Sequence, residues 1–207
     1  MLIKLKEIQE KYKIFPKILI HVGAHNAQEL NFYEECGVDK IFWVEANSSI
    51  VKSLKDNLEP SKNIIIEAVV SDSNNEEVNF NIANNTQASS ILDLGTHKSL
   101  FPDVSYVETQ IKRSKTLDSI FSSFYPIGDI DFLNLDIQGA ELKALKGFSD
   151  NLNRVKAIYT EINTEEVYKG CGLLSEIDDF LSGFGFDRME TKMWPNHPWG
   201  DAFYLKK

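Results

Sequence analysis

The sequence KILIHVGAHNAQ, residues 17–28, decides the fold. Residues 17–22 form a short apolar run that is typical of a buried strand, and they lead directly into a turn of small residues. Gly23, Ala24 and Ala27 would let a ligand approach the backbone at the carboxyl end of this strand, where open α/β sheets bind ligands. The segment lacks the full GxGxxG of a dinucleotide site. By itself, it could also be an ordinary strand-to-helix turn.

Apolar runs and helix-period segments alternate on either side of this turn. Strands are expected at residues 17–22, 40–44, 63–69, 130–135 and 157–162, with a short strand at 78–82. Helices are expected at residues 27–36 and 139–146, after the N-caps Asn47 and Thr116, and from Ser175. Two final strands, near 186–193 and 201–205, follow without a helix between them. The pattern predicts an α/β fold with a mostly parallel sheet, helices on both faces and an antiparallel C-terminal edge.

Composition and charge favour an ordinary globular domain. The 207 residues fit a single domain spanning residues 1–207, with a helical extension over 1–16. The net charge of −9 argues against nucleic-acid and membrane partners. Cys36 and Cys171 form no CxxC pair, so neither a zinc site nor a disulfide framework is expected. No signal peptide or membrane-length apolar run is evident, and the expected location is the cytoplasm.

Glu45 ends the second expected strand, KIFWVE, about 20 residues after the small-residue turn. An acid in this position suits hydrogen bonding to both ribose hydroxyls of a nucleotide, and it would repel a 2′-phosphate. The alternative is an exposed carboxylate at a strand end. The spacing and the position together favour the ribose interpretation.

A second acidic motif, LNLDIQGAELKALKGF, covers residues 133–148. Asp136 lies at the carboxyl end of an expected buried strand, and a buried carboxylate needs a partner such as a ligand ammonium or hydroxyl. Asp136 or Glu141 could instead stabilise the start of the following helix. We favour a ligand role for Asp136 and the helix role for Glu141.

Five segments taken in order resemble the FkbM-type methyltransferases: HVGAHNAQEL, WVEAN, NLDIQGAELKALKGF, YTEIN and WGDAFYLKK. The resemblance covers residues 17–207. It implies a Rossmann-like class I methyltransferase fold with a seven-stranded sheet. It also implies S-adenosylmethionine as methyl donor and O-methylation, commonly of a sugar or natural-product hydroxyl.

The resemblance also assigns residues to the donor site. These are His21, Gly23, Ala24, His25 and Gln28 in the donor loop, Glu45 and Ala46 at the ribose, Glu67 and Ala68 near the adenine, and Asp136 at the end of the fourth strand. This sequence departs from the family in two places: His21 stands where Asp is usual, and Ala27 where Gly is usual. His21 could be a core histidine, with Asp136 meeting more of the donor's amino-acid end, or it could act on the acceptor.

For the acceptor side, Glu161 and His197 are the leading candidates for the base that removes a hydroxyl proton, followed by Asp136 and His25. The expected acceptor is a small molecule or a glycan. Three aromatic residues could stack on a sugar or could simply pack: Trp194, Trp199 and Tyr168. No set of His, Asp and Glu has metal-ligand spacing, so no metal is expected. The sequence does not indicate an oligomeric state.

Two other functions share these features. An NAD-dependent oxidoreductase would have a similar turn and acid, although with a fuller glycine motif. A non-catalytic nucleotide-binding subunit could keep the fold without turnover.

The polar segment 84–94 is the best candidate for a mobile loop that closes over the site.

Overall fold

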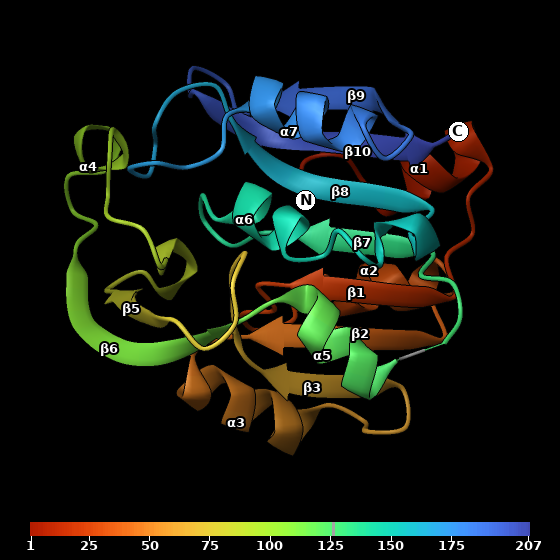
Figure 1. Ribbon diagram of the computed structural model, residues 1–207, viewed down its shortest axis with the longest axis horizontal. Helices are drawn as coiled ribbons and strands as arrows, with labels where there is room; N and C mark the ends of the chain where they lie inside the picture. The colour runs from red at the N-terminus through yellow and green to blue at the C-terminus, as the bar shows by residue number, and fades with distance from the viewer. Residues whose placement is uncertain (126) are drawn as a thin grey trace.

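The computed structural model describes residues 1–125 and 127–207. Its main sheet has seven strands in the order β3–β2–β1–β7–β8–β10–β9 (Figure 1). They are β1 (Ile18–Val22), β2 (Lys40–Glu45), β3 (Asn63–Glu67), β7 (Phe132–Leu135), β8 (Ala157–Asn163), β9 (Phe186–Met193) and β10 (Trp199–Lys206). The first five of these in sheet order are parallel, and β10 is antiparallel to both β8 and β9. The predicted fold class is confirmed.

Helices cover both faces of this sheet. One face packs against α5 (Leu117–Phe124), α6 (Glu141–Lys146) and α7 (Leu174–Ser182). The other packs against α1 (Leu5–Tyr12), α2 (Leu30–Glu35) and α3 (Ser48–Asn57). Successive side chains of a strand point to opposite faces, so Ile20 contributes to the first core and Leu19 to the second. Both cores exclude water from the strands, which explains their nearly continuous apolar sequences.

Two predicted helix caps are confirmed. The side chain of Asn47 accepts a hydrogen bond from the Ser49 N–H at the start of α3. The Thr116 hydroxyl accepts one from the Ser119 N–H at the start of α5. Each cap satisfies a backbone donor that has no partner within its helix.

The helix after the first strand begins at Leu30, three residues later than predicted. His25 and Ala27 have φ angles of 41° and 51°, and a right-handed helix cannot pass through that left-handed conformation. The chain therefore makes a turn before α2. Ala27 occupies a position at which glycine would be less strained, in agreement with the glycine usual in the resembling family.

A second, three-stranded sheet was not predicted as such, although the short strand expected at residues 78–82 is confirmed as one of its members. Its order is β4–β6–β5, with β4 at Val69–Val70, β5 at Glu77–Ala83 and β6 at Tyr106–Lys115. The predicted strand 63–69 is interrupted at Ala68, and its last part leaves the main sheet to pair with β6. The helix α4 (His97–Leu100) and the short 3₁₀ turns η1 (Thr86–Ala88) and η2 (Leu152–Arg154) complete the elements. Figure 1 places β5, β6 and α4 beyond the carboxyl ends of the parallel strands.

None of the helices in the described residues is long and apolar enough to cross a membrane.

Candidate functional site

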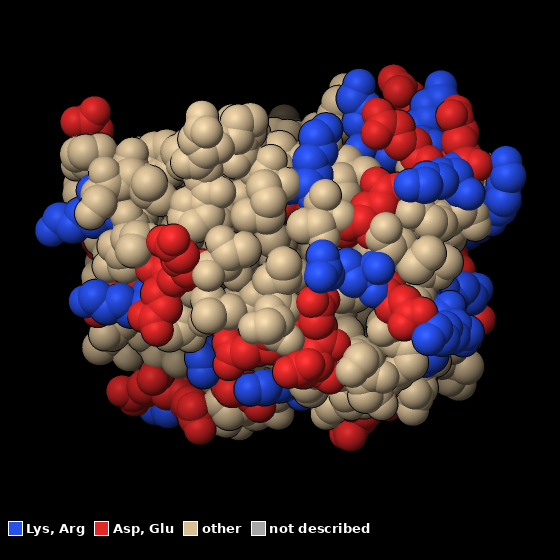
Figure 2. All heavy atoms as spheres, turned by 90° about the horizontal axis from the view of Figure 1, so that it is seen from above, with Lys and Arg blue, Asp and Glu red and all other residues tan. Residues whose placement is uncertain are grey.

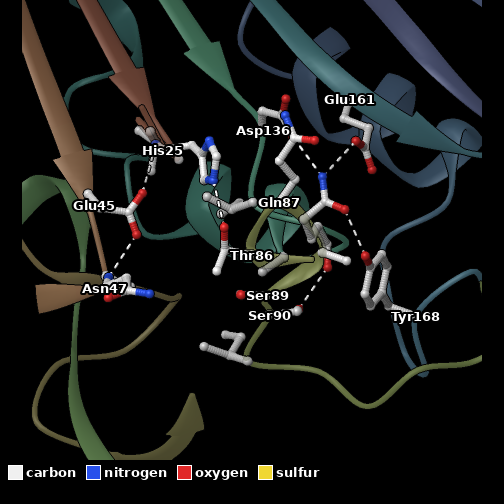
Figure 3. A pocket seen from close by; sticks show the side chains of 18 of the residues that line it. His25, Glu45, Asn47, Thr86, Gln87, Ser89, Ser90, Asp136, Glu161 and Tyr168 are labelled. Carbon is white, nitrogen blue, oxygen red and sulfur yellow. Dashed lines mark hydrogen bonds between the residues drawn. The ribbon is translucent and has the colours of Figure 1, made fainter. Parts of the chain in front are cut away.

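A cavity of about 520 Å³ lies at the carboxyl ends of the parallel strands. Its wall comes from the ends of β1, β2, β7 and β8 and from the segment that contains η1 (Figure 3). This volume falls in the range of small-molecule and cofactor sites, which are about 300–1,000 Å³. Parallel α/β sheets bind ligands at this edge, so the cavity is the candidate site.

Glu45, at the end of β2, is fixed in the cavity wall by two backbone hydrogen bonds. Its Oε2 accepts from the His25 N–H at 2.9 Å, and its Oε1 accepts from the Asn47 N–H at 2.7 Å (Figure 3). Burial raises the pKa of this carboxyl, and the two N–H donors partly offset the rise. Each carboxylate oxygen can accept a second hydrogen bond. Glu45 can therefore accept hydrogen bonds from two neighbouring hydroxyl groups while it keeps its two backbone hydrogen bonds.

The backbone geometry at position 23 requires a glycine whether or not a ligand is bound. Its φ is 91°, and a Cβ built there would lie 1.8 Å from the carbonyl oxygen of Asp136 on the adjacent strand end. From the sequence, a small residue at this position was expected to make room for a ligand beside the backbone. The structure shows that it would strike the backbone first, so the glycine allows the ends of β1 and β7 to approach each other.

His21 is a core histidine with one side at the cavity wall. It is 2% exposed, lies 3.1 Å from the Tyr33 hydroxyl through Nδ1, and packs on Trp43 with ring centroids 5.0 Å apart. Burial lowers its pKa to about 4. The side chain is consequently neutral at physiological pH and supplies no charge to a ligand.

Across the cavity, Gln138 joins two carboxylates. Its Nε2 donates to Asp136 Oδ1 at 2.8 Å and to Glu161 Oε2 at 3.0 Å, while its Oε1 accepts from the Tyr168 hydroxyl at 2.7 Å. Ser90 donates to the backbone carbonyl of Gln138 at 2.8 Å. All the hydrogen-bonding atoms of this amide group are engaged, so Asp136 and Glu161 are held side by side.

Buried acids near this bridge have raised pKa values. Glu161 has a pKa well above the ordinary value, first because it is buried and then because Asp136, Glu141 and Asp201 are negatively charged. The pKa of Glu141 rises to about 7, mainly through burial. Glu141 accepts backbone N–H bonds from Ile137 and Gly139, which is the structural role favoured from the sequence. The raised pKa makes Glu161 a better proton acceptor than an ordinary carboxylate.

The structure brings most of the predicted site residues together. The cavity is lined by His21, Gly23, His25, Gln28, Glu45, Ala46, Ala68, Asp136 and Glu161. Tyr168, Trp194 and Trp199 line it as well. The individual roles of these residues stay predictions.

Three predicted site residues lie outside this cavity. Ala24 is 1% exposed and packs in the core beside α2. Glu67 points outward, where it accepts a hydrogen bond from Ser48 and lies 3.8 Å from the Lys112 ammonium. His197 stacks on Phe101 at 5.4 Å and lines a separate surface pocket. The expectation that His197 shares one cavity with Glu161 is therefore not met.

The segment 84–94 lies against the cavity, as a covering loop would. Thr86 Oγ1 is 2.8 Å from His25 Nε2, and residues 85–91 form part of the wall (Figure 3). Only a few polar contacts, including the one from Ser90, tie the segment to the parallel-strand edge. Its mobility stays a prediction.

Sequence reasoning missed His97 and Gln138. His97 lines the cavity from α4, packs against Tyr168 and Phe101, and has a pKa lowered by burial. Its buried Nδ1 has no partner in residues 1–125 and 127–207. The short helix around His97 gives no periodic signal in the sequence. Gln138 does lie in the quoted motif, beside Asp136, and its position could have identified it.

The cavity is strongly acidic. Five carboxylates line it, from Glu29, Glu45, Asp136, Glu161 and Asp201, and its described lining residues include the N-terminal ammonium of Met1, 3.7 Å from Glu29, but no Lys or Arg. No group of three or more His, Cys, Asp or Glu in the described part of the chain is arranged to hold a metal ion.

Comparison with known sequences gives a family match over most of the chain. A family model described as the Methyltransferase FkbM domain matches residues 21–188. One curated relative, 2-O-methyltransferase NoeI of Sinorhizobium fredii (strain NBRC 101917 / NGR234), is 23% identical over 176 residues. That alignment covers 81% of this chain and 72% of the relative.

Solved structures share the fold at low sequence identity. Magnesium protoporphyrin IX methyltransferase (ChlM) from Synechocystis PCC 6803, with bound SAH, has a TM-score of 0.53 and 9% identity, covering 98% of this chain and 80% of that one. Methyltransferase FkbM from Methylobacillus flagellatus KT has a TM-score of 0.51 and 13% identity, covering 92% of this chain and 43% of that one.

Proposed function

The chain belongs to the FkbM methyltransferase domain family and is an S-adenosylmethionine-dependent methyltransferase, and we propose that it methylates a hydroxyl oxygen of a sugar, glycan or related small metabolite. One observation carries the proposal: a fixed carboxylate suited to a ribose and a buried, proton-accepting carboxylate face the same cavity. The relative NoeI is named a 2-O-methyltransferase, which agrees with an oxygen acceptor.

The residues present fit the donor. Glu45 offers both carboxylate oxygens to the ribose hydroxyls, and the backbone turn at Gly23 leaves room beside it. Ala68, Val69 and Phe80 give an apolar wall on the same side for the adenine. When bound, S-adenosylmethionine supplies an electrophilic methyl group on a sulfonium.

The acceptor end lies farther along the same sheet edge. Three strand spacings separate β2, which carries Glu45, from β8, which carries Glu161, and this corresponds to about 14 Å. Glu161 takes the hydroxyl proton as the oxygen becomes a nucleophile, because it lines the cavity and burial raises its pKa above that of an ordinary carboxyl. Tyr168 and the stacked pair Trp194 and Trp199 line this end with aromatic surface.

The surface charge supports a small acceptor over a nucleic acid. On the face seen in Figure 2, acidic and basic side chains are interspersed, and they form no continuous basic area. The acidic cavity would also repel a phosphate backbone. The family match favours a methyl donor over the NAD-linked alternative suggested by the sequence.

The test is a methyl-transfer screen of glycans, free sugars and nucleotide sugars with mass-spectrometric detection. We expect a mass increase of one methyl group, located on oxygen by fragmentation. Methylation on nitrogen or carbon alone would contradict the O-methylation proposal. Binding of S-adenosylhomocysteine without transfer to any acceptor would instead support a non-catalytic subunit.

A further inference from the structure

The acceptor end of the cavity carries more carboxyl groups than cations, because the only cation among its described lining residues is the N-terminal ammonium of Met1, which lies 3.7 Å from Glu29. Asp136, Glu161 and Asp201 all contribute carboxyl groups there, and the described lining residues include no Lys or Arg. Asp201 is occupied by the Tyr159 hydroxyl and the Leu2 N–H. The other two acids remain available to a ligand.

Asp136 and Glu161 each have one oxygen left open. The Gln138 amide engages Asp136 Oδ1 and Glu161 Oε2, and no other described side chain or backbone group bonds to Asp136 Oδ2 or Glu161 Oε1. Two acceptors on one amide nitrogen lie about 5 Å apart at ordinary hydrogen-bond angles. Two neighbouring polar groups of one small molecule can therefore contact both carboxyl groups.

A third unpartnered group faces the same end. His97 is 8% exposed, lines the cavity, and has a buried Nδ1 with no hydrogen-bond partner in the described chain. A buried polar atom without a partner is costly, and a ligand donor would satisfy it. An imidazole nitrogen and two carboxyl groups together call for a ligand rich in N–H and O–H donors.

We propose, on the basis of the proposed function, that the acceptor is an amine-bearing polyol, with a protonated amine next to the hydroxyl that is methylated. The amine lies against Asp136, and the hydroxyl lies against Glu161. A cation here offsets repulsion between neighbouring carboxylates, whereas a phosphate or carboxylate on the acceptor would increase it. The aromatic side chains beside this end pack against the ring.

The experiment measures binding of matched monosaccharides to the complex of the full chain with S-adenosylhomocysteine. Glucosamine and galactosamine are compared with glucose, galactose, their N-acetylated amines and their 6-phosphates by ligand-observed NMR at slightly acid pH. We expect the amines to bind at least tenfold more tightly than the uncharged sugars, and the phosphates to bind least. Asp136→Asn should remove the preference. The exposed Asp103→Asn, which changes charge outside the cavity, should retain it.

The inference is overturned by equal affinity for amines and uncharged sugars, or by no detectable binding of either amine at millimolar concentration. Tighter binding of the phosphates would overturn it as well. Binding of S-adenosylhomocysteine is measured first, because its failure would count against the proposed function and not against the acceptor class. If Asp136→Asn fails to fold, the salt dependence of amine binding to the unmodified protein gives a second measurement. A charge-based preference must weaken as salt rises.

Discussion

Replacing Glu45 with glutamine tests the donor site directly. The substitution keeps the shape and one carbonyl oxygen, but it replaces a charged acceptor by an N–H₂ donor. That amide nitrogen must face either the His25 N–H or the Asn47 N–H, both of which now donate to the carboxylate. We therefore expect weaker donor binding and a lower melting temperature, with the fold retained.

The magnitude follows from the hydrogen bonds at stake. One hydrogen bond to a charged group contributes about 1.5–3 kcal/mol, which corresponds to a loss of about 10- to 150-fold in affinity. Glu45 is 8% exposed, and water cannot fully replace a lost partner there. The burial and the two backbone bonds also mean that Glu45→Ala would destabilise the protein more than an exposed strand-end carboxylate would.

Isothermal calorimetry with S-adenosylhomocysteine measures the effect, and Glu67→Gln is the matched control. Glu67 ends the neighbouring strand in register with Glu45, yet its side chain lies outside the cavity. We expect Glu67→Gln to bind the nucleotide as the unmodified protein does. The ribose assignment is refuted by a folded Glu45→Gln protein with affinity within twofold of the original. A loss in Glu67→Gln as large as that in Glu45→Gln would also refute it.

Four further outcomes are expected. Gly23→Ala should lower both the melting temperature and the affinity for the donor, since its Cβ meets a neighbouring backbone carbonyl. A mutant with unchanged melting temperature and unchanged donor affinity, both measured by calorimetry, would contradict this. Glu161→Gln should slow methyl transfer by about 10²–10⁴ while donor binding persists, and a rate within a few-fold would place the base elsewhere. Hydrogen exchange in residues 84–94 should slow when donor and acceptor bind; unchanged exchange would indicate an inert loop. Because the raised pKa values of Glu141 and Glu161 make the folded state bind more protons than the unfolded state, thermal stability should increase as the pH falls from about 8 to 6.5. Below 6.5, the lowered pKa of His21 opposes the gain, and a flat profile above 6.5 would contradict this assignment.

Buried parallel strands and their terminal acids could be predicted from the sequence. Runs such as residues 17–22 are apolar on both faces, and the residue that ends each strand must lie at the ligand edge. Glu45, Asp136 and Glu161 were found by that rule, and all three line the cavity. The antiparallel edge was recognisable because no helix separates the last two strands.

The small sheet as a whole could not be predicted. Because it was missed, Glu67 was expected beside the ligand, whereas the structure places it outside the cavity. The strand β6 exposes its apolar Val107 and Ile111, which are separated by three polar residues, so it lacks the apolar–polar alternation that signals a buried face. Lys112 on that strand pairs with Glu67 and directs it outward. His97 was missed for a related reason: it lies in a four-residue helix that is positioned by tertiary contacts and not by a periodic pattern.

The order of strands in the main sheet also bears on how such a protein can change over generations. Glu45 and Gly23 sit at the ends of β2 and β1 in the parallel part of the sheet, whereas Glu161 sits on β8, which borders the antiparallel β10 that carries Trp199, and α4 comes from an excursion outside the sheet. Mutations in α4 and β10 alter one end of the cavity while β1 and β2 keep their packing. The proposed donor end can thus be inherited unchanged as selection, or a protein engineer, reshapes the opposite end for a different acceptor.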